Sequence, residues 1–306
     1  MGIDALIERI RDKRNPTVAG LDPRLEHLPP WLLAEEIAAS GETLAAAANA
    51  VRRFNTALLD ALADVVPAVK LQSACYEALG PEGMAVLRDS IAYARALGYY
   101  VIADAKRGDI GSTAECYSAA FLGRVRVGQT DIAPFDADAV TVNPYQGSDS
   151  IKPFLEDMKT YDRAIFVLGR TSNRSSSELQ MLCVPDRPLY RAVADLTDRW
   201  GMPFVGKYGY TSVGLVVGAT QPSEIRELRE HFPQLFFLVP GYGAQGGTAW
   251  DVSRAFDRMG RGAIVNSSRA ILCAWQKKGA PENFAEAARA EALRMKEELG
   301  KCIQCM

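Results

Sequence analysis

The strongest chemical signal in the sequence is a group of charged residues at the ends of three short apolar segments. Asp104 and Lys106 end one β-branched run two positions apart, so strand alternation predicts that their side chains share a face. Lys70 and Asp22 lie near the ends of two earlier runs. Buried charges are costly unless they are paired, and this set alternates in sign. We therefore expect either a stabilising ion-pair network or a site of electrostatic catalysis.

Two later segments have the residue types that hold an anion. The stretch Pro240–Gly247 (PGYGAQGG) is rich in glycine, which lets backbone amides approach a phosphate closely. A later run ends in Ser268 and Arg269, which offer the free amides of a helix start and a guanidinium for bidentate binding. The alternative for Arg269 alone is a surface helix residue. The glycines also match G-x-G-x-x-G, but the surroundings do not fit a dinucleotide-binding unit.

These residues must be positioned by a regular scaffold, and the hydrophobic pattern supplies one. Short β-branched runs alternate with longer amphipathic stretches, which is typical of βα units around a parallel sheet. The predicted strands are Thr17–Asp22, Ala68–Gln72, Tyr100–Asp104, Ala139–Asn143, Ala164–Leu168, Val213–Val217, Phe236–Val239 and Ala263–Asn266. The predicted helices between and after them are Leu44–Leu62, Glu82–Ala96, Ser112–Leu122, Leu189–Trp200, Pro222–His231 and Glu282–Leu299.

This pattern predicts an α/β fold, a single (β/α)8 TIM barrel over residues 1–306 with an extra N-terminal helix within Met1–Arg14 and a C-terminal helix. Three segments exceed normal connection lengths: Pro23–Gly41, Gly123–Asp136 and Gly169–Pro188. The first and third follow strand ends and are expected over the carboxyl-terminal mouth of the barrel. The third is serine-rich and equally fits a flexible surface loop. The second is an insertion without a predicted role.

Composition limits the partners of the chain. Its 35 basic and 37 acidic residues are spread throughout, so we expect no nucleic-acid partner and no membrane partner. No run is long enough to span a bilayer, and the N-terminus does not read as a secretion signal. Six scattered cysteines favour reduced core thiols, and therefore a cytoplasmic location. Cys302 and Cys305 lack the partners of a zinc site, and the role of their tail stays open.

The segment Asp104–Thr113 (DAKRGDIGST) resembles the D-x-K-x-x-D signature of orotidine-5′-phosphate decarboxylases, which continues with an isoleucine and a threonine. Asp22, Lys70 and the two anion-binding segments extend the resemblance over nearly the whole predicted barrel. It is closest to the longer bacterial class of that family. The resemblance implies decarboxylation of orotidine 5′-phosphate to uridine 5′-phosphate (UMP) and CO2, the last step of de novo pyrimidine synthesis, without metal or other cofactor.

The resemblance also implies roles for the charged residues. Lys106 would stabilise the developing carbanion and then protonate it, with Asp104 beside the substrate carboxylate. Lys70 would orient Asp104 and touch the ribose, and Asp22 would bind a ribose hydroxyl. Asp109 would complete this catalytic set.

Further roles concern the remaining parts of the substrate. Gln245 and Arg269 are expected at the phosphate, next to Ser268. Either Thr171 or Ser172 would contact the pyrimidine. In the family, the residues that correspond to Asp109 and Thr113 reach the active site of the neighbouring subunit, which implies a homodimer with shared sites.

Three functions other than orotidine 5′-phosphate decarboxylation are also compatible with parts of the sequence. A related class of barrel enzymes carries the same D-x-K-x-x-D core and processes sugar phosphates with Mg²⁺; the continuation through Thr113 and the Gln245 segment favour the decarboxylase. A Schiff-base aldolase would need a neutral amine at Lys70 or Lys106, whereas neighbouring carboxylates keep lysine charged. A silent phosphate-ligand sensor is the third, because a fold does not fix a function.

Overall fold

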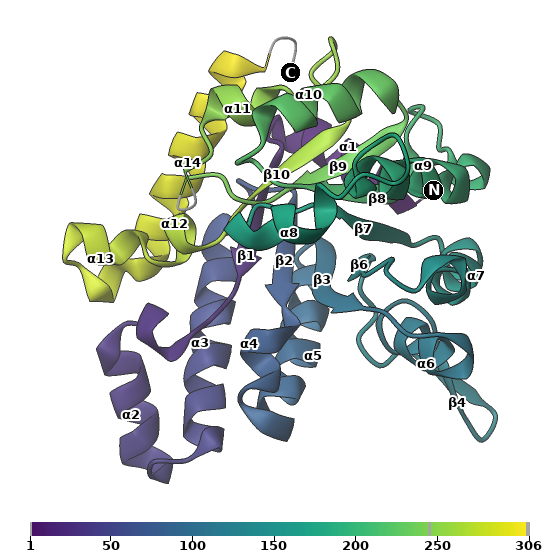
Figure 1. Cartoon of the computed structure of the whole chain (residues 1–306). Coiled ribbons are helices and arrows are strands. Elements are labelled where there is room, and N and C mark those ends of the chain that lie inside the picture. Colours follow the sequence, from purple (N-terminus) through teal and green to yellow (C-terminus); the bar gives the residue numbers. More distant parts are fainter. Residues whose placement is uncertain (1, 244–245, 304–306) are drawn as a thin grey trace.

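A computed structural model describes residues 2–243 and 246–303 of the chain. Within these residues, eight parallel strands close into a barrel in the order β1-β10-β9-β8-β7-β6-β3-β2, which confirms the predicted architecture (Figure 1). The barrel strands are β1 (Thr17–Leu21), β2 (Ala68–Gln72), β3 (Tyr100–Arg107), β6 (Ala139–Val142), β7 (Ala164–Arg170), β8 (Thr211–Val217), β9 (Leu235–Val239) and β10 (Ala263–Ser267).

Helices surround the barrel, and each predicted helical segment contains one of them. Those in predicted segments are α1 (Gly2–Lys13), α3 (Leu44–Leu62), α5 (Gly80–Ala96), α6 (Gly111–Phe121), α9 (Leu189–Gly201), α10 (Pro222–His231) and α14 (Phe284–Cys302). Those not predicted are α2 (Pro30–Ser40), α4 (Ser73–Glu77), α7 (Lys152–Tyr161), α8 (Ser177–Gln180), α11 (Ala249–Ser253) and α13 (Ala274–Lys278). Helix α12 (Arg269–Leu272) begins where a helix start was expected. The Thr43 side chain caps α3 by accepting a hydrogen bond from the Ala46 N–H.

Alternate residues of the strands face the barrel interior and form one of its apolar clusters. Val18, Ala68 and Ile102 belong to that cluster, together with Ile3 and Leu6 of α1. Helix α1 therefore buries its apolar face against the interior of the barrel, which explains why the chain has an extra N-terminal helix. Since Val18, Ala68 and Ile102 point inward, Asp22, Lys70 and Asp104 further along the same strands are directed to the inner side of the mouth.

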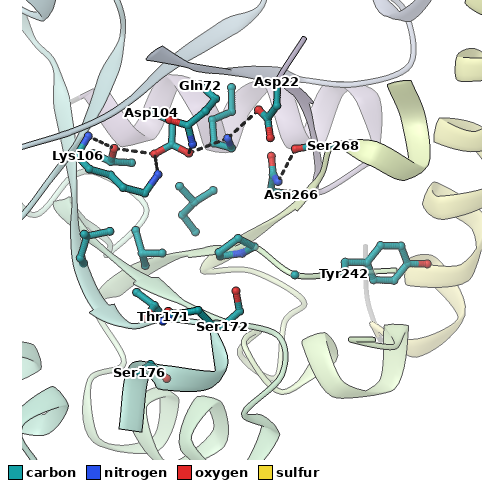
Figure 2. Close-up of a pocket in the computed structure, with 18 of the residues that line it drawn as sticks. Asp22, Gln72, Asp104, Lys106, Thr171, Ser172, Ser176, Tyr242, Asn266 and Ser268 are labelled. Atoms are coloured by element: carbon teal, nitrogen blue, oxygen red, sulfur yellow. Dashed lines mark hydrogen bonds and ion pairs between the residues drawn. The ribbon is translucent and has the colours of Figure 1, made fainter. Parts of the chain in front are cut away.

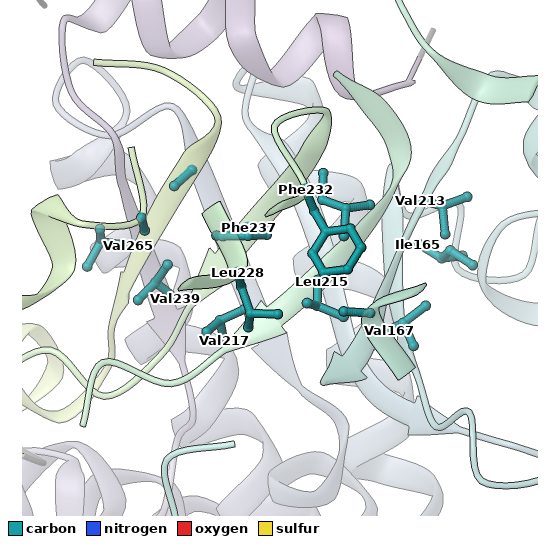
Figure 3. Close-up of a cluster of buried hydrophobic side chains, with 14 of the residues drawn as sticks. Ile165, Val167, Val213, Leu215, Val217, Leu228, Phe232, Phe237, Val239 and Val265 are labelled. Atoms are coloured by element: carbon teal, nitrogen blue, oxygen red, sulfur yellow. The ribbon is translucent and has the colours of Figure 1, made fainter. Parts of the chain in front are cut away.

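The outward faces of the strands pack against the helices. Figure 3 shows this for β7 to β10, where Leu215, Val217 and Phe237 lie with Leu228 and Phe232, from α10 and the residue that follows it. These side chains are almost completely removed from water. Their burial holds the strands, and therefore the residues at the strand ends, in fixed relative positions.

The three long segments are more ordered than the sequence suggested. Pro23–Gly41 contains a 3₁₀ turn (Leu25–His27) and helix α2, with Pro30 at a position where proline favours a helix start. Gly169–Pro188 begins inside β7 and contains α8. Gly123–Asp136 forms an antiparallel hairpin of β4 (Val125–Val127) and β5 (Thr130–Ile132).

Two further expectations concern the state of the cysteines and the absence of a membrane-spanning run. Cys75, Cys116, Cys183, Cys273 and Cys302 are all free thiols. Cys75 and Cys273 are partly buried against an apolar core cluster, whereas Cys116 and Cys183 are exposed, so the expectation of reduced core thiols is confirmed only in part. Cys305 lies outside the described residues. No helix in these ranges is both long and apolar enough to cross a membrane.

Candidate active site

A cavity of about 770 Å³ opens where the carboxyl-terminal ends of the barrel strands meet. Of the predicted site residues, Asp22, Lys70, Asp104, Lys106, Thr171, Ser172, Ser268 and Arg269 line it. Figure 2 shows Asp22, Asp104 and Lys106 on one side of this space, with Thr171 and Ser172 across from them. The structure thus brings together in one cavity residues that are far apart in the sequence.

Asp104 is the centre of the charged side of the cavity. Its carboxylate lies between two ammonium groups, with Lys70 Nζ 2.7 Å from Oδ2 and Lys106 Nζ 2.6 Å from Oδ1. Lys70 also contacts Asp22 Oδ1 at 3.3 Å. Asp104 and Lys70 are buried, whereas the Lys106 side chain is 44% exposed. The chain of alternating charges therefore ends in an ammonium group that a ligand in the cavity can reach.

Two polar side chains that were not among the predicted site residues complete the surroundings of Asp104. Gln72 Nε2 donates to Oδ2 at 3.1 Å, and Thr141 Oγ1 donates to Oδ1 at 2.9 Å. Alternation could have found both, because Gln72 follows Lys70 by two positions and Thr141 follows the inward-facing Ala139 by two. With two lysines and two neutral donors, the carboxylate has four hydrogen-bond partners.

The charges stabilise one another's ionised forms. Burial alone would raise the pKa of Asp104, but the charges of Lys70 and Lys106 outweigh it and lower the pKa below the ordinary value. Burial alone would lower the pKa of Lys70, but the charges of Asp104 and Asp22 raise it instead. Asp104 therefore stays a carboxylate, and Lys70 stays an ammonium group.

Lys106 lies on the predicted side of the strand, but not through simple alternation. Its φ is 48°, in the left-handed region, and the register of β3 against β6 shifts between Ala103 and Arg107. Its backbone N–H donates to Thr141 Oγ1 at 2.9 Å, which helps to hold the irregular conformation. A non-glycine residue in this region costs about 1–3 kcal/mol and is frequent at functional sites.

The predicted phosphate side of the cavity is built from β10 and the start of α12. Asn266 Nδ2 donates to Ser268 Oγ at 3.2 Å, and Ser268 immediately precedes the helix. Gly20 of β1 leaves room for this pair, since a Cβ atom at that position would lie 1.9 Å from Ser268 Oγ. Arg269 lines the same cavity, and Gln245 lies outside the described residues.

Asp109 and Thr113 do not line the cavity of their own chain. The Asp109 carboxylate accepts a hydrogen bond from the Ile110 N–H at 2.8 Å, and Thr113 is exposed on α6. Their expected place in a neighbouring subunit's site stays a prediction.

The donor set of the cavity suits lysines better than a metal ion. In residues 2–243 and 246–303, no group of three or more histidine, cysteine, aspartate or glutamate side chains is placed to hold a metal ion. Asp22 and Asp104 each already contact a lysine ammonium group. The arrangement can stabilise negative charge that develops near Lys106 and can supply a proton there.

Comparison with known proteins shows the family of the chain. Residues 42–284 match the family described as Orotidine 5′-phosphate decarboxylase / HUMPS. An orotidine 5′-phosphate decarboxylase from Rhodopirellula baltica is 43% identical over 288 residues, 92% of this chain and 93% of that protein. The enzyme of that name from Caldicellulosiruptor saccharolyticus is 38% identical over 300 residues, 98% of each chain.

A solved structure shows the same likeness in three dimensions. A Toxoplasma gondii protein proposed to be an orotidine-monophosphate-decarboxylase superposes with a TM-score of 0.79 at 31% identity, and the match covers 98% of both chains. The likeness extends along almost the whole barrel, as the sequence resemblance predicts. This chain belongs to the orotidine 5′-phosphate decarboxylase family.

Proposed function

We propose that this chain converts orotidine 5′-phosphate to UMP and CO2 without a metal or prosthetic group. The observation that carries the proposal is the Asp104 carboxylate, which is held between Lys70 and Lys106 at 2.7 and 2.6 Å in a cavity large enough for a nucleotide. Loss of CO2 leaves an electron pair on a ring carbon with no adjacent carbonyl to delocalise it. An ammonium group fixed beside that carbon supplies the missing stabilisation.

Lys106 is the proposed proton donor. The bond from the ring carbon to the carboxyl group breaks, its electron pair stays on the ring carbon, and that carbon takes a proton from Lys106 Nζ. Solvent then returns a proton to the lysine. Lys106 suits this role because its side chain is 44% exposed to the cavity while Asp104 holds its Nζ at 2.6 Å.

Asp104 acts in two ways in this proposal. It orients Lys106, and it places a negative charge beside the substrate carboxylate. Two like charges about 4 Å apart repel by about 4 kcal/mol at an effective dielectric constant near 20, and departure of CO2 removes that repulsion. The low pKa of Asp104 keeps this charge in place when the substrate enters. Lys70, fixed between Asp104 and Asp22, holds Asp104 in position and lies near the proposed ribose contacts.

The phosphate of the substrate takes no part in bond breaking, but its binding energy can orient the ring against Lys106. Ser268 and Arg269 are the proposed contacts in the described part of the chain, and Gln245 is the third. We further propose a homodimer in which Asp109 and Thr113 of each subunit complete the site of the other. Their position outside the cavity of their own chain supports this arrangement.

The second candidate is a Mg²⁺-dependent enzyme of sugar phosphates, because the matching family description also includes the HUMPS group. The pairing of Asp22 and Asp104 with Lys70 argues against it, since carboxylates that bind Mg²⁺ must be available to the ion.

The test is turnover of orotidine 5′-phosphate by purified protein in excess EDTA, followed by the loss of orotate absorbance. We expect full activity, unchanged when Mg²⁺ replaces EDTA. Inactivity in both conditions would refute the proposal. Activity on a sugar phosphate that EDTA abolishes would establish the second candidate instead.

A further inference from the structure

The segment after β7 contains a set of contacts that the mechanism above does not use. Gln180, at the end of α8, points its amide at Thr171, the first residue after the strand. Gln180 Oε1 accepts a hydrogen bond from the Thr171 backbone N–H at 2.9 Å, and Gln180 Nε2 donates to Thr171 Oγ1 at 2.7 Å. One side-chain amide therefore fixes both the backbone and the side chain of Thr171.

Thr171 has its own hydrogen donors occupied in this arrangement. Its N–H goes to Gln180, and its hydroxyl donates to Asn173 Oδ1 at 2.6 Å. Thr171 and Ser172 are the two alternatives for the pyrimidine contact. Thr171 and Ser172 both line the cavity, where Figure 2 shows them next to each other, so this fixed segment lies at the expected pyrimidine contact.

Ser172 is held from the other side by the end of β8. Gly218 lies directly against it, since a Cβ atom at Gly218 would be 2.6 Å from the Ser172 nitrogen. Thr220 Oγ1 donates to the Ser172 carbonyl oxygen at 3.1 Å. The Thr171–Ser172 segment is thus fixed between Gln180 on one side and the β8 end on the other.

Arg170 anchors Gln180 in turn. It is 3% exposed, and its Nη1 donates to Gln180 Oε1 at 3.3 Å and to Ser176 Oγ. Its Nη2 lies 3.7 Å from Glu224 Oε1 on α10. A buried guanidinium with these partners has little freedom to move, so the Gln180 amide that it contacts is also held in place.

We propose that Gln180 is a positioning residue that fixes the Thr171–Ser172 segment in its ligand-binding conformation before the nucleotide arrives. Without the hydrogen bonds from Gln180, ligand binding would have to order the Thr171–Ser172 segment. The free-energy cost of that ordering would weaken affinity for the pyrimidine part of the ligand. The inference rests on the proposed function for the nature of the ligand. The expected effect is confined to binding of the pyrimidine ring, because the proposed phosphate contacts come from other parts of the chain.

The test compares two probes that differ by the ring. UMP carries ring, ribose and phosphate, whereas ribose 5-phosphate lacks the ring, and both affinities are measured by calorimetry. Gln180→Leu keeps the approximate size and removes both hydrogen bonds to Thr171. Two lost hydrogen bonds predict an increase of about 10- to 100-fold in the Kd for UMP, with the Kd for ribose 5-phosphate unchanged. Glu178→Gln, an exposed change on the same short helix, is the matched control and should leave both values unchanged.

A second variant separates the two hydrogen bonds. Gln180→Glu keeps the acceptor for the Thr171 N–H and Arg170 but removes the donor to Thr171 Oγ1, so its UMP affinity should fall between wild type and Gln180→Leu. It also provides the test if Gln180→Leu does not fold.

Two results would overturn the inference: an equal loss for both probes, which marks a general structural role, or no loss for UMP. A wild-type chain that bound UMP without decarboxylating orotidine 5′-phosphate would refute the proposed function and leave this inference standing.

Discussion

Replacing Asp104 with asparagine tests whether ion pairs hold the charged side of the cavity. The substitution keeps the shape of the side chain and removes its charge, which leaves Lys70 with Asp22 at 3.3 Å as its remaining acidic partner. Lys70 is 3% exposed, so water cannot replace the lost carboxylate. Lys106 is far more exposed, so water can partly replace the contact that its ammonium group loses.

The expected magnitude follows from this difference. Removing one partner of a buried ion pair typically costs about 3–5 kcal/mol. Lys70 keeps its contact to Asp22, and Lys106 is partly exposed to water. We therefore expect Asp104→Asn to lower the free energy of unfolding by about 3 kcal/mol, near the lower end of that range. Urea denaturation with an unchanged m-value would measure it.

The contributions of Asp104 and Lys70 to folding stability change with pH in a predictable direction. The pKa of Asp104 is lowered on folding, so its contribution to stability is present above the unfolded value of about 3.9 and is lost as pH falls through the lower folded pKa. The pKa of Lys70 is raised, so its contribution is present below about 10.4 and is lost only as pH rises through the higher folded pKa. The difference between wild type and Asp104→Asn should be flat from about pH 5 to 9 and should shrink in stronger acid.

A cost below about 1 kcal/mol, or a difference that changes between pH 5 and 8, would refute this reasoning. The double variant Lys70→Met/Asp104→Asn supplies the control. It removes the buried Lys70 charge, which keeps only Asp22 as a partner in the single variant, so it should be less destabilised than Asp104→Asn alone.

Three other perturbations have expected outcomes. Gly20→Ala should lower the free energy of unfolding by about 1–3 kcal/mol in a urea titration, because its Cβ would lie 1.9 Å from Ser268 Oγ; wild-type stability would contradict that packing. Arg269→Ala should weaken UMP and ribose 5-phosphate equally in calorimetry, by about 10- to 100-fold, whereas a loss confined to UMP would move Arg269 away from the phosphate. Asp109→Asn and Lys106→Ala, each inactive alone, should regain about a quarter of wild-type activity after subunit exchange, and no recovery would refute shared sites.

The sequence was most informative where periodicity and charge coincide. Lys70 and Asp104 could be predicted because each follows inward-facing residues of a buried strand, and only a mouth position or a paired partner tolerates a charge there. Thr141 and Gln72 obey the same alternation, but a neutral polar residue at a strand end costs little to bury once it is hydrogen-bonded, so its type alone does not indicate a site. The left-handed backbone at Lys106 had no signal in its residue type.

Other features depend on tertiary contacts that no local pattern encodes. The hydrogen bonds between Gln180 and Thr171 lie in a long serine-rich segment without periodicity, and Arg170 of β7 and Thr220 after β8 contact that segment. Helix α2 was missed because Leu32 is its only fully buried residue, which leaves little amphipathic pattern. Helix α7, which buries Phe154 and Met158, was also not predicted, although one of its faces is apolar.

The most direct test of the central claim is turnover of orotidine 5′-phosphate in EDTA by Lys106→Ala, with Lys159→Ala on the surface as the control. We predict that the control matches wild type and that Lys106→Ala loses about 10⁴-fold or more in rate while it still binds UMP, because both charge stabilisation and the proton donor are removed. A Lys106→Ala protein within about 10-fold of the wild-type rate would contradict the assignment of Lys106 as the group that stabilises and protonates the carbanion.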